Sequence, residues 1–154
     1  MTGTMSIILR EMTTQDYDNV YALWMSIQGF AIRSVDDSRE GVERFLKRNP
    51  LTSVVAVHNG RVVGSILCGH DGRRGCFYHV CVAKEYRGHG VGQKMVGFAL
   101  AALKKEGICK VNLIAFKSNE IGNQFWRGME WTERTDLNYY DLAINEANLT
   151  EFIK

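Results

Sequence analysis

Three alternating glycines, Gly88, Gly90 and Gly92, lie where a β-rich run gives way to a helical pattern. Glycine removes a side chain where the backbone must approach a ligand closely, and the first N–H groups of a helix have no partner within it. Those donors and the positive end of the helix dipole suit an anion. Arg87 before the glycines and Lys94 after them add positive charge. The segment therefore predicts a cradle for a diphosphate.

Two common phosphate-binding motifs do not fit this spacing. A dinucleotide fingerprint that used Gly88 and Gly90 would need a third glycine at position 93, where the chain has glutamine. A P-loop would need a Gly-Lys-Ser/Thr sequence, whereas Lys94 follows Gln93 and precedes Met95. The residues thus disfavour NAD and ATP by these two routes.

The run from Arg87 to Gly92 resembles the Arg/Gln-x-x-Gly-x-Gly/Ala signature of the GNAT superfamily of acyl-CoA-dependent N-acetyltransferases. The resemblance implies acetyl-CoA as a cosubstrate, and cysteines without Cys-x-x-Cys spacing argue against a metal. It places His89 at the cofactor through its backbone. The implied cofactor contacts in the strand end and the loop are Val80, Cys81, Val82, Arg87, Gly88, His89, Gly90, Val91, Gly92 and Gln93.

A second block, residues 117–131, resembles the Asn-x-x-Ala-x-x-Phe-Tyr-x-x-x-Gly-Phe segment of the same superfamily. By resemblance, its helix borders the pantetheine arm of coenzyme A, with Asn119, Asn123, Phe125 and Trp126 on that wall. Phe125 could equally be an ordinary core aromatic residue. Many family members have tyrosine where this chain has Trp126, and the tyrosine hydroxyl can protonate the leaving thiolate. The indole N–H is too weak an acid for that task.

The resemblance implies direct attack of a neutral amine on the thioester through an oxyanion, for which backbone N–H groups near Cys81 and Val82 are the family's solution. His79 is the candidate base, although a histidine in a strand is more often structural. Tyr139 or Tyr140 could protonate the thiolate, but solvent is favoured because a thiol with a pKa of about 8.5 leaves tolerably well. Nothing in the spacing indicates covalent transfer through the Cys81 thiol.

The acceptor is expected between residues 28–37 and 136–140, where Arg33, Asp36 and Asp37 could read a small zwitterion or a peptide N-terminus. A solvated loop is the simpler interpretation of that segment. The leading hypothesis is an N-acetyltransferase acting on a primary amine of a small molecule or peptide. The alternative is a catalytically silent acyl-CoA-binding or regulatory domain, suggested by Trp126. Dimers are common in the superfamily, and the sequence leaves a homodimer open.

Composition is that of an ordinary globular domain, so residues 1–154 are expected to form one unit. A net charge of +2 without a basic block gives no reason to expect nucleic acid or an anionic membrane. Residues 1–5 show no signal-peptide pattern, and a cytoplasmic location is the default expectation. Cysteines 68, 76, 81 and 109 lack Cys-x-x-Cys spacing and are expected to be reduced core residues.

The elements that must position these groups follow from periodicity and turn residues. Asn59-Gly60 between β-branched runs predicts a hairpin, and capping signals near Thr13 and Asp37-Ser38 predict two helices before it. Further strands are predicted at 7–10, 76–82, 111–115 and within 131–142, with helices at 91–106, 121–129 and 145–154. This order is the GNAT order, and it predicts an α/β fold with a mixed, mostly antiparallel sheet flanked by helices.

Overall fold

The computed structural model describes residues 6–154. The N-terminal pentapeptide used above to judge a signal peptide lies outside these residues. Five strands form the central sheet: β1 (Ile8–Glu11), β3 (Val54–His58), β4 (Arg61–His70), β5 (Gly75–Val82) and β6 (Val111–Asn112). They are ordered β1-β3-β4-β5-β6, and every neighbouring pair is antiparallel except β5–β6, which is parallel. The predicted mixed, mostly antiparallel sheet is confirmed.

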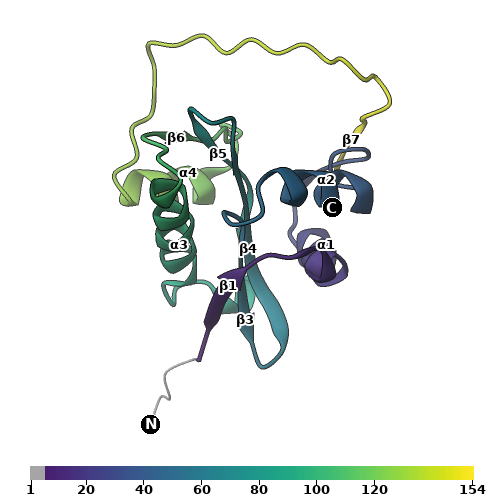
Figure 1. Cartoon of the computed structure of the whole chain (residues 1–154), viewed down its shortest axis with the longest axis vertical. Helices are drawn as coiled ribbons and strands as arrows, with labels where there is room; N and C mark the ends of the chain where they lie inside the picture. Colours follow the sequence, from purple (N-terminus) through teal and green to yellow (C-terminus); the bar gives the residue numbers. More distant parts are fainter. Residues whose placement is uncertain (1–5) are drawn as a thin grey trace.

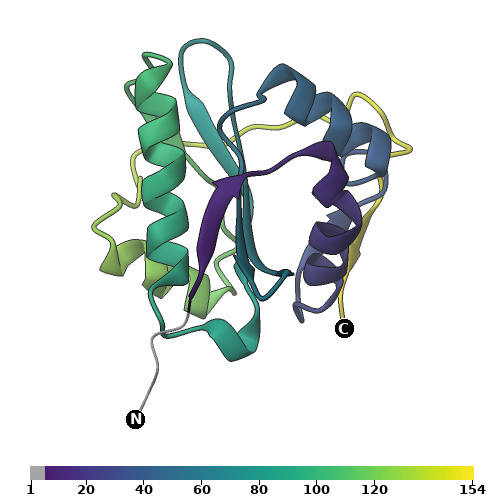
Figure 2. The same cartoon turned by 60° about the horizontal axis from the view of Figure 1, so that its bottom comes forward.

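Helices cover both faces of this sheet (Figures 1 and 2). Helices α1 (Tyr17–Met25) and α2 (Arg39–Arg48) lie on one face, and α3 (Val91–Lys105) and α4 (Glu120–Gly128) lie on the other. Short 3-10 turns at Thr14–Asp16 and Lys84–Tyr86 precede α1 and α3. None of the helices in residues 6–154 combines the length and apolar character needed to span a bilayer.

Local chemistry explains several boundaries. Asn59 and Gly60 have φ angles of 49° and 77°, which match the turn required by a tight hairpin between β3 and β4. The N-cap of α2 is Ser38, whose hydroxyl accepts a hydrogen bond from the Gly41 N–H at 3.1 Å. Of the two capping candidates Asp37 and Ser38, the structure therefore assigns the role to Ser38.

The C-terminal segment, residues 131–154, differs from the prediction. Residues 131–142 contain no strand, and 145–154 form no helix. Instead, β7 (Thr150–Phe152) pairs with β2 (Ala31–Arg33), a strand that the sequence pattern did not indicate. Figure 1 shows the intervening chain as a long arc from the side of α4 to the side of α2. The alternating residues in this arc have no strand beside them in the described chain, so their strand preference is not realised.

Three further expectations are adjusted. The strand predicted at 111–115 is confined to Val111–Asn112. Cys68 and Cys81 are buried as expected, but Cys76 is only partly buried and Cys109 is exposed, so Cys109 is not a core residue. All four cysteines are free thiols.

Candidate functional site

The edge of β5 that faces β6 is paired for only two residues. Gly75 pairs with Val111 and Cys76 with Asn112, and β5 then continues alone along this edge to Val82 within the described chain. The edge presents backbone donors and acceptors that no described strand satisfies. Such an edge can hydrogen-bond an extended ligand.

Strand alternation tells which N–H groups face this open edge. The Ala83 N–H donates to the Val63 carbonyl of β4 at 2.8 Å, and Cys81 is paired with Ser65 of the same strand. Because successive residues point their backbone groups to opposite edges, the N–H groups of Val80 and Val82 face away from β4. These two N–H groups, rather than that of Cys81, therefore face the open edge.

The glycine segment lies directly beyond this edge. Gly88 and Gly90 have φ angles of 81° and 79°, in the left-handed region that glycine occupies without strain. Gly90 is the N-cap of α3 and offers no side chain to the helix N–H groups, and the first turn contains no acidic residue. The N–H groups opening α3 are therefore available to an anion, and the residues present fit a diphosphate.

The side chains of the segment divide into two kinds. Val91 is 2% exposed and anchors α3 in the core, whereas His89 and Gln93 are exposed. The exposed Arg87 donates from Nε to the Val82 carbonyl at 3.1 Å, which ties the loop to the end of β5. The segment thus combines a buried anchor with an exposed backbone surface.

Gly92 has a different role from that of Gly90. A Cβ atom at Gly92 would lie 3.1 Å from both Cε1 and Cζ of Phe125. The helices α3 and α4 therefore approach closely at this point, and a side chain on residue 92 would push Phe125 aside. This glycine is therefore required for the close packing of the two helices.

Helix α4 carries the predicted pantetheine wall. The Asn119 side chain caps the helix by accepting the Gly122 N–H at 3.0 Å, and Asn123 Nδ2 donates to the carbonyls of Phe116 and Asn119. Trp126 packs against Phe125, Trp131 and Phe77 with ring centroids 4.6–6.3 Å apart. The two asparagines thus hold the start of α4, and the aromatic residues form one cluster against β5.

His79 occupies a β-bulge in β5. The register with β4 shifts between Ser65 and Leu67, and His79 has a φ angle of 51°, which is uncommon for a residue with a side chain. Its imidazole Nε2 lies 2.8 Å from Oδ1 of Asp37. The bulge places this side chain on the α1 face, one residue before the open-edge N–H of Val80. Strained residues often mark functional sites.

Asp37 is the residue that sequence reasoning missed as a partner of His79. It is 4% exposed, so it cannot act as the solvent-facing reader of a zwitterion considered above. Asp36 is exposed and binds Asn148 Nδ2 at 2.8 Å. No local pattern links positions 37 and 79, because their contact depends on how the loop before α2 packs against β5.

The remaining candidates lie in contrasting settings. Burial raises the pKa of the Cys81 thiol to about 11, which keeps it protonated and disfavours a nucleophilic role. Its Sγ lies 3.5 Å from Ser65 Oγ, which accepts from the Trp24 indole at 3.2 Å. Tyr139 and Tyr140 are 67% and 85% exposed and belong to the C-terminal arc. Their roles as acids stay predictions.

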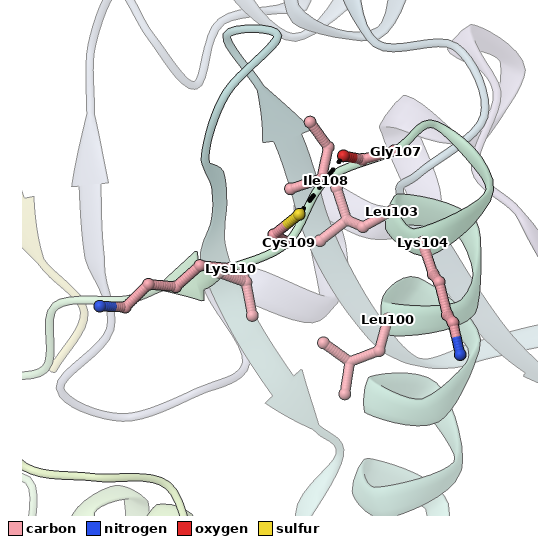
Figure 3. A pocket seen from close by; sticks show the side chains of 8 residues that line it. Leu100, Leu103, Lys104, Gly107, Ile108, Cys109 and Lys110 are labelled. Atoms are coloured by element: carbon pink, nitrogen blue, oxygen red, sulfur yellow. Dashed lines mark hydrogen bonds between the residues drawn. The ribbon is translucent and has the colours of Figure 1, made fainter.

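A separate hollow of about 420 Å³ lies between the end of α3 and β6 (Figure 3). It is lined by Leu100, Leu103, Lys104, Gly107, Ile108, Cys109, Lys110 and Val111. None of these residues belongs to the predicted site. Among residues 6–154, no three or more His, Cys, Asp or Glu side chains are grouped to hold a metal ion.

Comparisons with known proteins agree on one family. A profile of the Acetyltransferase (GNAT) family matches residues 17–131. An acetyltransferase of Sodalis glossinidius is 30% identical over 123 residues, which cover 80% of this chain and 85% of the relative.

Solved structures share the fold. The PaiA N-acetyltransferase of Thermoplasma acidophilum, in complex with coenzyme A, gives a TM-score of 0.69 at 17% identity, covering 81% of this chain and 89% of that one. The ribosomal-protein-alanine N-acetyltransferase of Brucella melitensis biovar Abortus gives 0.67 at 17% identity, covering 91% of this chain and 100% of that one.

Proposed function

Because the chain belongs to the acetyltransferase (GNAT) family, we propose that it transfers an acetyl group from acetyl-CoA to a primary amine of a small molecule or peptide. One observation carries the proposal: the open edge of β5 ends beside the glycine N-cap of α3. The edge suits an extended pantetheine arm, and the helix N-terminus suits a diphosphate. Coenzyme A contains both an extended pantetheine arm and a diphosphate.

The residues divide the binding task between backbone and side chains. The N–H groups of Val91, Gly92 and Gln93 open α3 and would bind the diphosphate, with Arg87 adding charge. The wall formed by Phe125, Trp126 and the two asparagines of α4 would border the arm. The Val80 and Val82 N–H groups would donate to the thioester carbonyl oxygen, where negative charge develops during the attack.

Acetyl-CoA supplies the acetyl group as a thioester. The amine nitrogen forms a bond to the acetyl carbon and the carbon–sulfur bond breaks, so the amine loses one proton and the thiolate gains one. His79 would accept the amine proton, directly or through water. Solvent would protonate the thiolate, since Trp126 cannot and the thiol has an ordinary pKa of about 8.5.

The alternative of a catalytically silent acyl-CoA-binding domain rests only on Trp126. The curated relatives are named acetyltransferases, which supports an active enzyme. These names support acetyl transfer, and the choice of a small-molecule or peptide amine as acceptor is our proposal.

Calorimetric titration of the purified protein with acetyl-CoA tests the cofactor, with NADH as the control. We expect an acetyl-CoA Kd of roughly micromolar order and no heat with NADH. Release of free CoA thiol is then followed by a colorimetric assay with amino acids, polyamines and peptides that carry a free N-terminus. Failure to bind acetyl-CoA would contradict the cofactor assignment, whereas binding without turnover on any amine would favour the silent domain.

A further inference from the structure

The loop before α2 holds a buried carboxylate in a rigid position. The Asp37 N–H donates to the Arg33 carbonyl at 2.9 Å, and the Asp37 carbonyl accepts from the Tyr17 hydroxyl at 2.6 Å. The side-chain oxygen Oδ2 accepts from the Arg33 N–H at 2.7 Å. Three interactions independent of His79 therefore set the direction of Oδ1.

The imidazole that meets Oδ1 is also held tightly. Its side chain is 12% exposed, and its ring centroid lies 4.7 Å from those of both Trp24 and Phe30. Nε2 is bonded to Asp37 at 2.8 Å. Nδ1 has no hydrogen-bond partner within residues 6–154. Every fully buried side-chain nitrogen or oxygen atom in these residues has a hydrogen-bond partner, so Nδ1 is not fully buried. Nδ1 therefore retains contact with solvent.

These contacts determine the tautomer of neutral His79. An ionised carboxylate only accepts hydrogen bonds, so Nε2 must carry the hydrogen and the lone pair must reside on Nδ1. We propose that Asp37 is a positioning residue that fixes His79 as the Nε2–H tautomer and thereby presents Nδ1 as the base for the acceptor amine. This inference rests on the proposed acetyltransferase function.

The same carboxylate stabilises the product of proton transfer. When Nδ1 takes a proton from the amine, the imidazole becomes a cation whose Nε2–H still donates to Oδ1 of Asp37. The pair then changes from a neutral–charged hydrogen bond to an ion pair in a mostly buried setting, where a charge-assisted bond is stronger. Asp37 thus assists both the orientation and the protonation of His79.

The substitution Asp37→Asn tests this directly because the loop leaves the amide one favourable orientation. The Arg33 N–H requires an acceptor, so the asparagine oxygen would face it and the NH₂ group would face His79. An NH₂ donor requires Nε2 to accept, which places the hydrogen on Nδ1. The variant should therefore keep the loop while inverting the tautomer.

Long-range ¹H–¹⁵N NMR correlations of the imidazole rings in the free protein report the tautomer without any substrate. Comparison with a His79→Gln spectrum identifies the signals of His79 among the four histidines. We expect Nε2–H in the wild type and Nδ1–H in Asp37→Asn. The matched control, Asp36→Asn, alters the exposed neighbouring carboxylate and should retain Nε2–H. A wild-type Nδ1–H tautomer would overturn the inference, even if Asp37→Asn failed to fold.

Kinetics of CoA thiol release with an amine found active in the screen test the consequence. Asp37→Asn should lower kcat about 100-fold, within the range for loss of general base catalysis, and leave the KM for acetyl-CoA within about twofold. In the His79→Gln background, the same substitution should change kcat by less than about twofold, because Asp37 acts through His79. An equal loss of kcat in both backgrounds would assign Asp37 a merely structural role.

The two proposals fail in different ways. If no amine is acetylated although acetyl-CoA binds, the proposed function fails, and the NMR result still decides whether Asp37 sets the tautomer. If amines are acetylated and Asp37→Asn retains the wild-type kcat, the function stands and the positioning role is rejected.

Discussion

The two faces of β5 are built in different ways. On the side of α1, side chains position side chains: Asp37 holds His79, and Ser65 links the Trp24 indole to the Cys81 thiol. On the side of α3, backbone conformation shapes the site: Gly90 lies in the left-handed region, and Gly92 allows α3 and α4 to approach.

The difference separates two kinds of vulnerability. A backbone cradle fails when a side chain is added, since the N–H groups lose their geometry or their access. A side-chain network fails when one polar partner is removed, since the other is left buried and unsatisfied. Substitutions on the two sides of β5 should therefore affect different measurements: ligand affinity and packing on one, proton transfer and acid stability on the other.

The largest effect is expected from Gly90→Val. Valine is strongly disfavoured at a φ of 79°, so the start of α3 would rearrange and misdirect its free N–H groups. We expect acetyl-CoA binding to weaken at least about 100-fold, equivalent to about 2.7 kcal/mol, when measured by calorimetry.

Gly97→Ala is the matched control for this variant. Gly97 lies in the same helix, is exposed, and an added Cβ would meet nothing within 4 Å. Alanine should raise the free energy of unfolding by about 0.5–1 kcal/mol and leave acetyl-CoA affinity unchanged. Unaltered affinity in Gly90→Val would refute the cradle.

Gly92→Val should act first on packing. The added side chain would overlap Phe125 and lower the free energy of unfolding by about 2–3 kcal/mol, measured by chemical denaturation. Combining it with Phe125→Ala should cost less than the sum of the two single changes, because the smaller residue makes room. Additive losses would show that Gly92 and Phe125 do not interact as described.

Lowering the pH should reduce the free energy of unfolding through Asp16, the carboxyl at the start of α1. Burial opposes ionisation of Asp16, but hydrogen bonds from Arg10 at 2.7 and 2.8 Å and from the Thr13 N–H at 2.8 Å outweigh it and lower the pKa of this carboxyl. The stabilisation is present above the unfolded-state value of about 3.9 and is lost as pH falls through the lower folded-state value.

Asp16→Asn removes this contribution. We expect a loss of about 1–2 kcal/mol at neutral pH, a modest value because the Arg10 side chain is 45% exposed. Denaturation measured across the acid range should show a weaker pH dependence for the variant than for the wild type. Parallel curves would mean that Asp16 is not the group responsible.

Much of the fold could be predicted because its signals are local. Asn59-Gly60 fixes a hairpin within a few residues, and α3 follows its N-cap Gly90 and repeats buried residues at helical spacing. The C-terminal region could not be predicted in the same way. Its only strand pairs Arg33 with Thr150, a contact between distant segments that no local pattern encodes.

The candidate site also has one part with a local sequence signal and one part that depends on contacts between distant segments. The glycine segment could be recognised in the sequence because a positive φ angle or a close backbone approach requires glycine at a given position. The Asp37–His79 contact could not, since a carboxylate near a helix start reads as a cap, and only the packed structure shows that Ser38 takes that role. Alternation along β5 likewise keeps the predicted Val82 N–H at the open edge and replaces that of Cys81 by that of Val80.

The smallest effect is expected from Trp126→Tyr, which introduces the hydroxyl that the resemblance to the family implies at this position. Tyrosine can pack with Phe77 and Trp131, so acetyl-CoA affinity should be retained. If solvent protonates the thiolate, an added acid has little to accelerate, and kcat should stay within about twofold in the CoA-release assay. Trp126→Phe provides the control for the change in ring size. A tenfold rise in kcat for tyrosine alone would show that thiolate protonation limits turnover, and that the α4 side of β5 also requires a side chain for proton transfer.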